Sequence, residues 1–104
     1  GAIVLNDRKR LKNFGFFTIV LNLSSKNKKL IGKPKFISRG FVYLKSSKRL
    51  LSELEKIVRT EHEIWLNDDK KKYLPDLQKK IQSKVSKHIY RQTEREPLIL
   101  VEII

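Results

Sequence analysis

The period of the apolar residues changes along the chain, and this pattern constrains the fold more than any other feature of the sequence. In residues 14–23 apolar side chains recur at every second position, and one face carries Phe17, Ile19, Leu21 and Leu23. That is the period of a half-buried strand. Residues 48–66 and 75–92 instead place apolar side chains at near-helical spacing, and residues 98–104 are mostly β-branched and apolar. The pattern therefore predicts strands toward both ends and two amphipathic helices between them.

The segment after the first strand predicts a hairpin with an irregular second strand. Residues 24–29 form a polar connection in which Asn27 suits a left-handed conformation, and residues 30–44 return to β-type side chains. Pro34 has no N–H to donate to a neighbouring strand, and Gly40 marks a bend or a close approach. We therefore expect the second strand at an edge of the sheet, or bulged.

The helices and the last strand carry recognisable end signals. Ser47 is a suitable N-cap for a helix over residues 48–66, and Pro75 suits the first turn of a helix that ends near Gln92. The second helix has a regular apolar stripe of Leu77, Ile81, Val85 and Ile89. After Pro97, residues 98–104 predict a well-buried strand. The expected fold class is α+β, a three-stranded sheet with two helices packed on one face, in the order β-β-α-α-β.

Length and composition bound the remaining possibilities. A chain of 104 residues is expected to form a single domain over residues 1–104, with residues 1–12 as a linker remnant, and the missing initial Met suggests an excised fragment. There is no Cys, which excludes disulfides and thiolate metal sites and fits a reducing compartment. No apolar run or signal peptide predicts membrane contact. We expect a cytoplasmic protein.

The charge is large and one-sided. The formal net charge is +13, and the stretch from Arg8 to Ser52 holds thirteen basic residues and no acidic one, whereas the rest of the chain holds eleven of each. A field of one sign attracts polyanions, of which RNA is the expected partner. The alternative is that these lysines mainly keep a small domain soluble.

Catalysis has little support in the sequence. His62 and His88 are the two side chains suited to acid–base work near neutral pH, as in a small metal-free ribonuclease. His62 lies between two glutamates without a second His at zinc-protease spacing, so we expect it at the surface; His88 borders the apolar stripe and is expected to pack. Asp68 and Asp69 are adjacent and have no third ligand nearby, which favours a solvated loop. We therefore expect no catalytic residue and no metal or cofactor in this chain.

Binding residues have better support. Lys80, Lys84, Lys87 and Arg91 follow helical spacing opposite the apolar stripe, where they either track phosphates or simply form a solvated face. Arg39 lies between Ser38 and Gly40, where a bend aims its guanidinium at a phosphate or a partner, or where its charge protects a strand edge. Arg95 is a further contact candidate near the last strand. The strand aromatics are candidates for base stacking, although core packing is the commoner role; they are Phe14, Phe16, Phe36 and Tyr43.

Three segments of the sequence together resemble the C-terminal domain of bacterial ribonuclease J, a metallo-β-lactamase and β-CASP nuclease. They are Asn6-Asp7-Arg8-Lys9 before the first strand, the run from Gly32 to Tyr43 that contains Ile37-Ser38-Arg39-Gly40-Phe41-Val42, and the run from Tyr90 to Leu100 with Thr93 and Pro97 before the last strand. The chain departs from the family pattern at Lys35, usually acidic, at Glu96, usually basic, and in a hairpin turn without glycine.

The resemblance implies that catalysis belongs to another domain of the family's proteins. In the family, two metal ions and their ligands belong to an upstream β-lactamase domain, so zinc is expected in the parent and no catalytic residue carries over to this chain. The full enzyme cleaves RNA internally and from the 5′ end, and its C-terminal domain, a three-stranded sheet with two helices, supports dimer assembly and full activity. We therefore expect an accessory domain that contacts RNA, the parent's catalytic domains and a second subunit; the alternative is a free-standing basic nucleic-acid-binding module.

Overall fold

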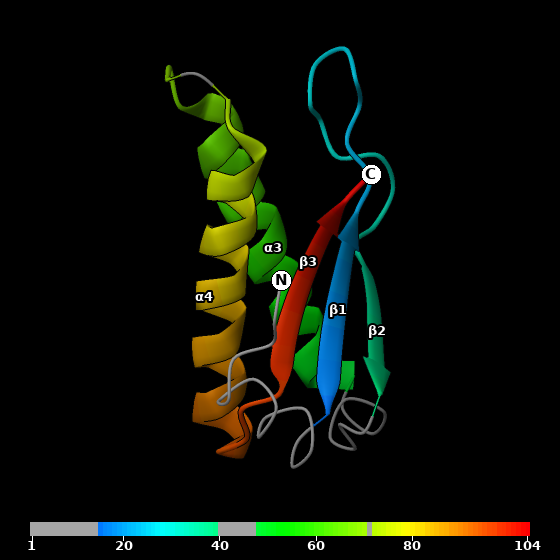
Figure 1. Cartoon of the computed structure of the whole chain (residues 1–104), viewed down its shortest axis with the longest axis vertical. Helices are drawn as coiled ribbons and strands as arrows, with labels where there is room; N and C mark the ends of the chain where they lie inside the picture. The colour runs from blue at the N-terminus through cyan, green and yellow to red at the C-terminus, as the bar shows by residue number, and fades with distance from the viewer. Residues whose placement is uncertain (1–14, 40–47, 71) are drawn as a thin grey trace, which may run out of the picture.

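The computed structural model describes residues 15–39, 48–70 and 72–104. Three strands and two helices follow in the predicted order (Figure 1): β1 (Phe16–Leu21), β2 (Lys35–Arg39), α3 (Lys48–Asn67), α4 (Leu74–Thr93) and β3 (Leu98–Ile103). The α+β class and the β-β-α-α-β order are thereby confirmed. The helix bounds agree with the predicted ones to within one or two residues, and Pro75 occupies the first turn of α4 as expected.

The three strands form a mixed sheet in the order β2-β1-β3. β1 pairs with β2 in antiparallel and with β3 in parallel orientation. A parallel pair needs a long crossover connection, and the chain between β1 and β3 contains β2 and both helices. Figure 1 shows α3 and α4 together on one side of the sheet. The other side of the sheet is left without a covering layer among the described residues.

The hydrophobic core lies between the sheet and the helix pair. Phe17, Ile19 and Leu21 of β1 are fully buried, as their alternation predicts. They meet the apolar stripes of both helices; the helical members of the core are Leu50, Leu54, Val58, Leu77, Ile81, Val85 and Ile89. The ring of Phe36 stacks on that of Phe17 with 5.4 Å between centroids, so Phe36 belongs to the core as well.

The two outer strands compare differently with their predictions. β2 is an edge strand, as Pro34 indicated; it begins directly after that proline, and the described part of it ends at Arg39. The prediction that the last strand is well buried was wrong, because β3 is the other edge and Leu100 is 42% exposed. Several predicted features lie outside the described residues: the linker 1–12, Phe14, Gly40, Tyr43 and the Ser47 cap.

The β1–β2 connection is held by its own polar groups and by His62. The side chain of Asn27 accepts a hydrogen bond from the Lys29 N–H, while Lys28, not Asn27, adopts the left-handed conformation, at φ 61°. His62 Nε2 donates to the Lys28 carbonyl at 2.9 Å. The expectation of a surface His62 was wrong: the residue is only 6% exposed, because its partner comes from a loop that sequence proximity does not reveal.

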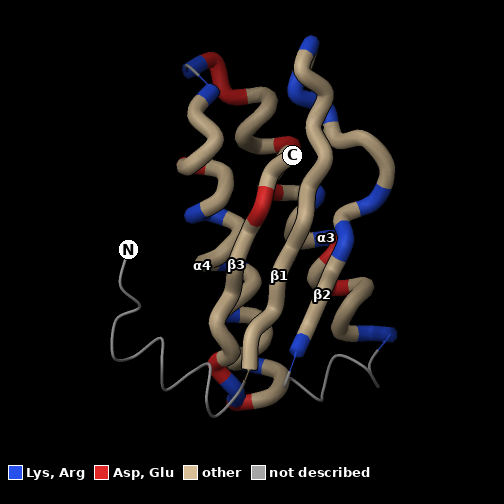
Figure 2. The backbone as a smooth tube through the Cα atoms, turned by 45° about the vertical axis from the view of Figure 1, so that its right-hand side comes forward, with Lys and Arg blue, Asp and Glu red and all other residues tan. Residues whose placement is uncertain are grey.

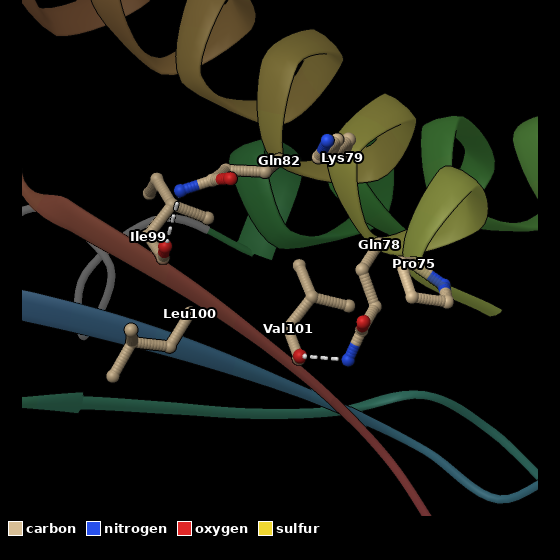
Figure 3. A pocket seen from close by; sticks show the side chains of 7 residues that line it. All are labelled: Pro75, Gln78, Lys79, Gln82, Ile99, Leu100 and Val101. Carbon is tan, nitrogen blue, oxygen red and sulfur yellow. Dashed lines mark hydrogen bonds between the residues drawn. The ribbon is translucent and has the colours of Figure 1, made fainter. Parts of the chain in front are cut away.

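Two glutamines of α4 cover the free edge of β3. Gln82 Nε2 donates to the Ile99 carbonyl at 2.9 Å, and Gln78 Nε2 donates to the Val101 carbonyl at 3.0 Å (Figure 3). Figure 3 also shows Leu100 pointing away from α4. Because a bare strand edge invites pairing with another chain, these side chains protect β3 by occupying its outward carbonyls.

Replacing Gln78 and Gln82 by Ala together is expected to lower the free energy of unfolding by about 1 kcal/mol for each lost hydrogen bond. Gln92→Ala, in the same helix but exposed and without a hydrogen bond to the described residues, is the matched control and should leave stability unchanged. Urea denaturation measures both. Equal stability of the double variant and the control would show that the glutamines do not hold the edge of β3.

Candidate assembly and nucleic-acid surfaces

The face of the sheet that no described helix covers is largely apolar along its middle. In the register of the sheet, Thr18 is flanked by Ile37 on β2 and by Leu100 on β3, and these three side chains form a row across the strands. Ile37 is 49% exposed and Leu100 is 42% exposed, while Thr18 between them is buried. Phe16 and Leu98 continue the apolar surface in the next row. We call this surface the open sheet face.

Charges of opposite sign border the open sheet face. Arg39 pairs with Phe16 at one end of β2 and Lys35 pairs with Val20 at the other, so both lie on the open sheet face. Glu102 lies beside Val20 on β3 and is also exposed. Figure 2 shows basic residues at both ends of β2 and an acidic one on β3. The structure therefore places Arg39 at the rim of an apolar surface, away from the helical lysines.

The four basic residues predicted on α4 are all exposed, but they lie to the side of the buried stripe that faces α3. Lys84 and Arg91 line a groove of about 230 Å³ between the helices, together with Lys56, Thr60 and Glu61 of α3. Lys80 and Lys87 are on the same exposed side of α4 by helical spacing. Three cations and one carboxylate give this groove a net positive charge, which suits a phosphate backbone.

A second hollow adjoins the C-terminal half of α4. It has a volume of about 300 Å³ and is lined by Ser86, Lys87, Tyr90, Arg91 and Glu96. Arg91 lines both this hollow and the interhelical groove. The sequence prediction included Lys87 and Arg91 and missed Tyr90 and Glu96, although Tyr90 is one helical turn from both Ser86 and Lys87.

The other predicted contact residues are placed apart from these hollows. Arg95 is exposed after α4, and its N–H donates to Thr93 Oγ1 at 3.1 Å. Lysines also crowd the β1–β2 connection, at Lys26, Lys28, Lys29 and Lys33, where Figure 2 shows basic residues at one end of the molecule. Of the aromatic stacking candidates, Phe36 packs in the core and Phe16 is half-buried on the open sheet face.

The two histidines have separate structural partners. His88 Nε2 contacts Glu53 Oε2 at 2.9 Å, which joins α4 to α3 and confirms that His88 packs, while His62 holds the loop carbonyl described above. Glu53 also pairs with Arg49 one turn earlier. Within residues 15–39, 48–70 and 72–104, no group of three or more His, Asp or Glu side chains is placed to hold a metal ion. None of the helices in the described part of the chain is long and apolar enough to cross a membrane.

Replacing Lys84, Lys87 and Arg91 together by Gln is expected to change the free energy of unfolding by no more than about 0.5 kcal/mol per substitution, because exposed side chains contribute little to stability. Ile81→Ala, in the buried stripe of the same helix, should by contrast cost about 2–5 kcal/mol. Thermal or urea unfolding compares the two. A triple variant as unstable as Ile81→Ala would mean that these cations are structural.

Comparison with known proteins gives a consistent match over nearly the whole chain. The model of the family described as "Ribonuclease J C-terminal domain" matches residues 3–104. A protein named ribonuclease J 2 from Streptococcus pyogenes is 38% identical over 100 residues, which is 96% of this chain and 18% of that protein. Proteins of the same name from Staphylococcus saprophyticus and Staphylococcus aureus are 35% identical over the same lengths. The chain thus spans about a fifth of the length of these relatives.

Proposed function

The chain belongs to the ribonuclease J C-terminal domain family, and on this premise we propose that it is a non-catalytic accessory domain of a ribonuclease J-type nuclease, where it supports subunit assembly and helps to hold RNA. Endonuclease and 5′–3′ exonuclease activity, together with zinc, are assigned by the same proposal to the part of the full-length protein that this chain does not span. The structural partners of both histidines support a non-catalytic role. The proposed setting is the cytoplasm, where the RNA to be processed is found.

The open sheet face is the observation that carries the assembly role. A three-stranded sheet covered by helices on one side exposes large apolar side chains, Ile37 and Leu100, in the middle of its other side. Contiguous apolar surface with a polar border is typical of a protein–protein interface. Since the β3 edge is already occupied by Gln78 and Gln82, docking is expected through the face and not by strand addition.

The occupant that fits the open sheet face best is a second copy of the same domain. Two copies packed face to face, with a twofold axis along the strands, place β2 of one over β3 of the other. Lys35 and Glu102 lie in the same row of the sheet, since both are beside Val20. The axis therefore brings Lys35 of each copy toward Glu102 of the other, and apolar residues meet in the middle.

The RNA role is supported by the charge and its placement. A net charge of +13 raises the local concentration of a polyanion around the domain, and the helical groove and the lysines of the β1–β2 connection lie off the open sheet face. Assembly and RNA contact therefore use different surfaces and can proceed together.

The assembly proposal predicts that Leu100→Asp abolishes self-association, because a carboxylate would be buried in the apolar middle of the interface. The control is Ile64→Asp, since Ile64 is equally apolar and 58% exposed but lies on α3. Sedimentation equilibrium over a range of protein concentrations should give a dimer for the wild-type chain and the control, and a monomer for Leu100→Asp. A wild-type chain that stays monomeric at every concentration would refute the assembly role.

The twofold arrangement makes a separate prediction about charge. Lys35→Glu and Glu102→Lys are each expected to weaken the dimer up to about fivefold for each of the two symmetry-related pairs, because each places like charges opposite one another at an exposed rim. Combining them restores the pairing with reversed signs, so the double variant should regain wild-type affinity. Additive weakening in the double variant would show that a different surface, or a different orientation, joins the subunits.

A further inference from the structure

The hollow beside the C-terminal half of α4 combines an aromatic wall with groups of both charges. Tyr90 is 50% exposed in a chain whose Phe17 and Phe36 pack in the core. Lys87 and Arg91 flank it on α4, and Glu96 approaches from the segment that leads to β3. Among the described residues, none of these side chains has an ion pair or hydrogen-bond partner, so their polar groups are available to a ligand.

The walls of the hollow are held in place by the end of α4. Glu94 adopts a left-handed conformation at φ 58°, and its N–H donates to the Tyr90 carbonyl at 2.7 Å, which ends the helix. Thr93 Oγ1 donates to the Ile89 carbonyl and accepts from the Arg95 N–H. On the far side, the Leu98 N–H donates to the Gly15 carbonyl. The backbone around Glu96 is therefore held by hydrogen bonds on both sides, at Glu94 and at Leu98. Binding a ligand here requires little further ordering of the backbone.

These groups match the parts of a nucleotide. Lys and Arg bind phosphate oxygens, an exposed aromatic ring stacks on an unpaired base, and a carboxylate accepts hydrogen bonds from a base amino group or a ribose 2′-hydroxyl. We propose that this hollow is a binding site for a nucleotide of single-stranded RNA, with the base on Tyr90, the phosphates at Lys87 and Arg91, and a hydrogen-bond donor of the base or ribose at Glu96. The inference rests on the RNA role proposed above and gives it a location and a specificity.

The groove between the helices extends the site to neighbouring phosphates. Arg91 lines both spaces, and Lys84 continues the cationic row toward Lys56 on α3. Lys84 and Arg91 are seven positions apart, which is about 10 Å along a helix at 1.5 Å per residue. A strand whose base is held at Tyr90 therefore passes its backbone along the groove. This continuity is what distinguishes the site from a pocket for a free mononucleotide.

Single-stranded RNA fits this site better than a duplex does. In a duplex the base faces are already stacked on one another, so Tyr90 has no base to receive. Glu96 further disfavours a purely phosphate ligand in the hollow, since its carboxylate repels a second anion. The lysines of the β1–β2 connection have no exposed aromatic ring among their described neighbours within the loop, and they are expected to add only charge.

Fluorescence anisotropy with a short labelled single-stranded RNA, titrated with the 104-residue chain at several salt concentrations, tests the site. Tyr90→Ala should weaken binding about 5- to 150-fold, the range for loss of one stacked base, with an unchanged salt dependence, and Tyr90→Phe should bind like the wild type. Lys87→Gln with Arg91→Gln should instead reduce the salt slope by about 1.4, because two phosphate contacts are lost. Glu96→Ala should weaken binding as well, because it removes the acceptor for a hydrogen-bond donor of the base or ribose.

Removing an equal charge elsewhere provides the control. Lys26→Gln with Lys29→Gln on the β1–β2 connection should affect binding less than the α4 pair does. If the two pairs cost the same and Tyr90→Ala binds like the wild type, RNA is held by charge in general and the site is refuted, while the RNA role stands. If the wild-type chain ignores the RNA even at low salt, the RNA role and the site fall together, and the sedimentation result still decides the assembly role.

Discussion

Everything on the surface of this domain depends on how its single core is closed. The buried face of β1 and the apolar stripes of both helices form one core cluster, which includes Phe17, Ile19 and Ile81. Both helices belong to the connection that leads from β1 to its parallel neighbour β3. Two helices suffice to cover one face of three short strands, and none of the described residues forms a layer over the other face. The open sheet face is thus a consequence of the topology. Because the helices pack against the other face of the sheet, their outer sides face solvent.

Periodicity predicted the parts of the fold that follow from local pattern. The alternation in β1 and the helical stripes identified nearly every core residue, and the order of elements followed from them. It did not predict that β3 is an edge strand, because an apolar run has the same pattern at the centre and at the edge of a sheet. It also missed the burial of His62, whose partner is the Lys28 carbonyl, 34 positions away.

The candidate sites divide in the same way. Helical spacing alone placed Lys84, Lys87 and Arg91 on one side of α4. Glu96 joins them only because the chain turns at Glu94 and is then anchored at β3, and no local pattern encodes that approach. Arg39 lies at the rim of the open sheet face, and the bend predicted at Gly40 lies outside the described residues. Residues whose role depends on two distant segments were therefore the ones that sequence reasoning missed.

The central claim is that subunit contact and RNA contact occupy different surfaces of one accessory domain. Amide chemical-shift mapping by NMR tests it directly, with ¹⁵N-labelled chain that is first concentrated and then titrated with single-stranded RNA. Concentration should shift the amides around Thr18, Ile37 and Leu100, and RNA should shift those around Tyr90 and Glu96. RNA-induced shifts centred on the open sheet face, or concentration-dependent shifts centred on the end of α4, would contradict the claim.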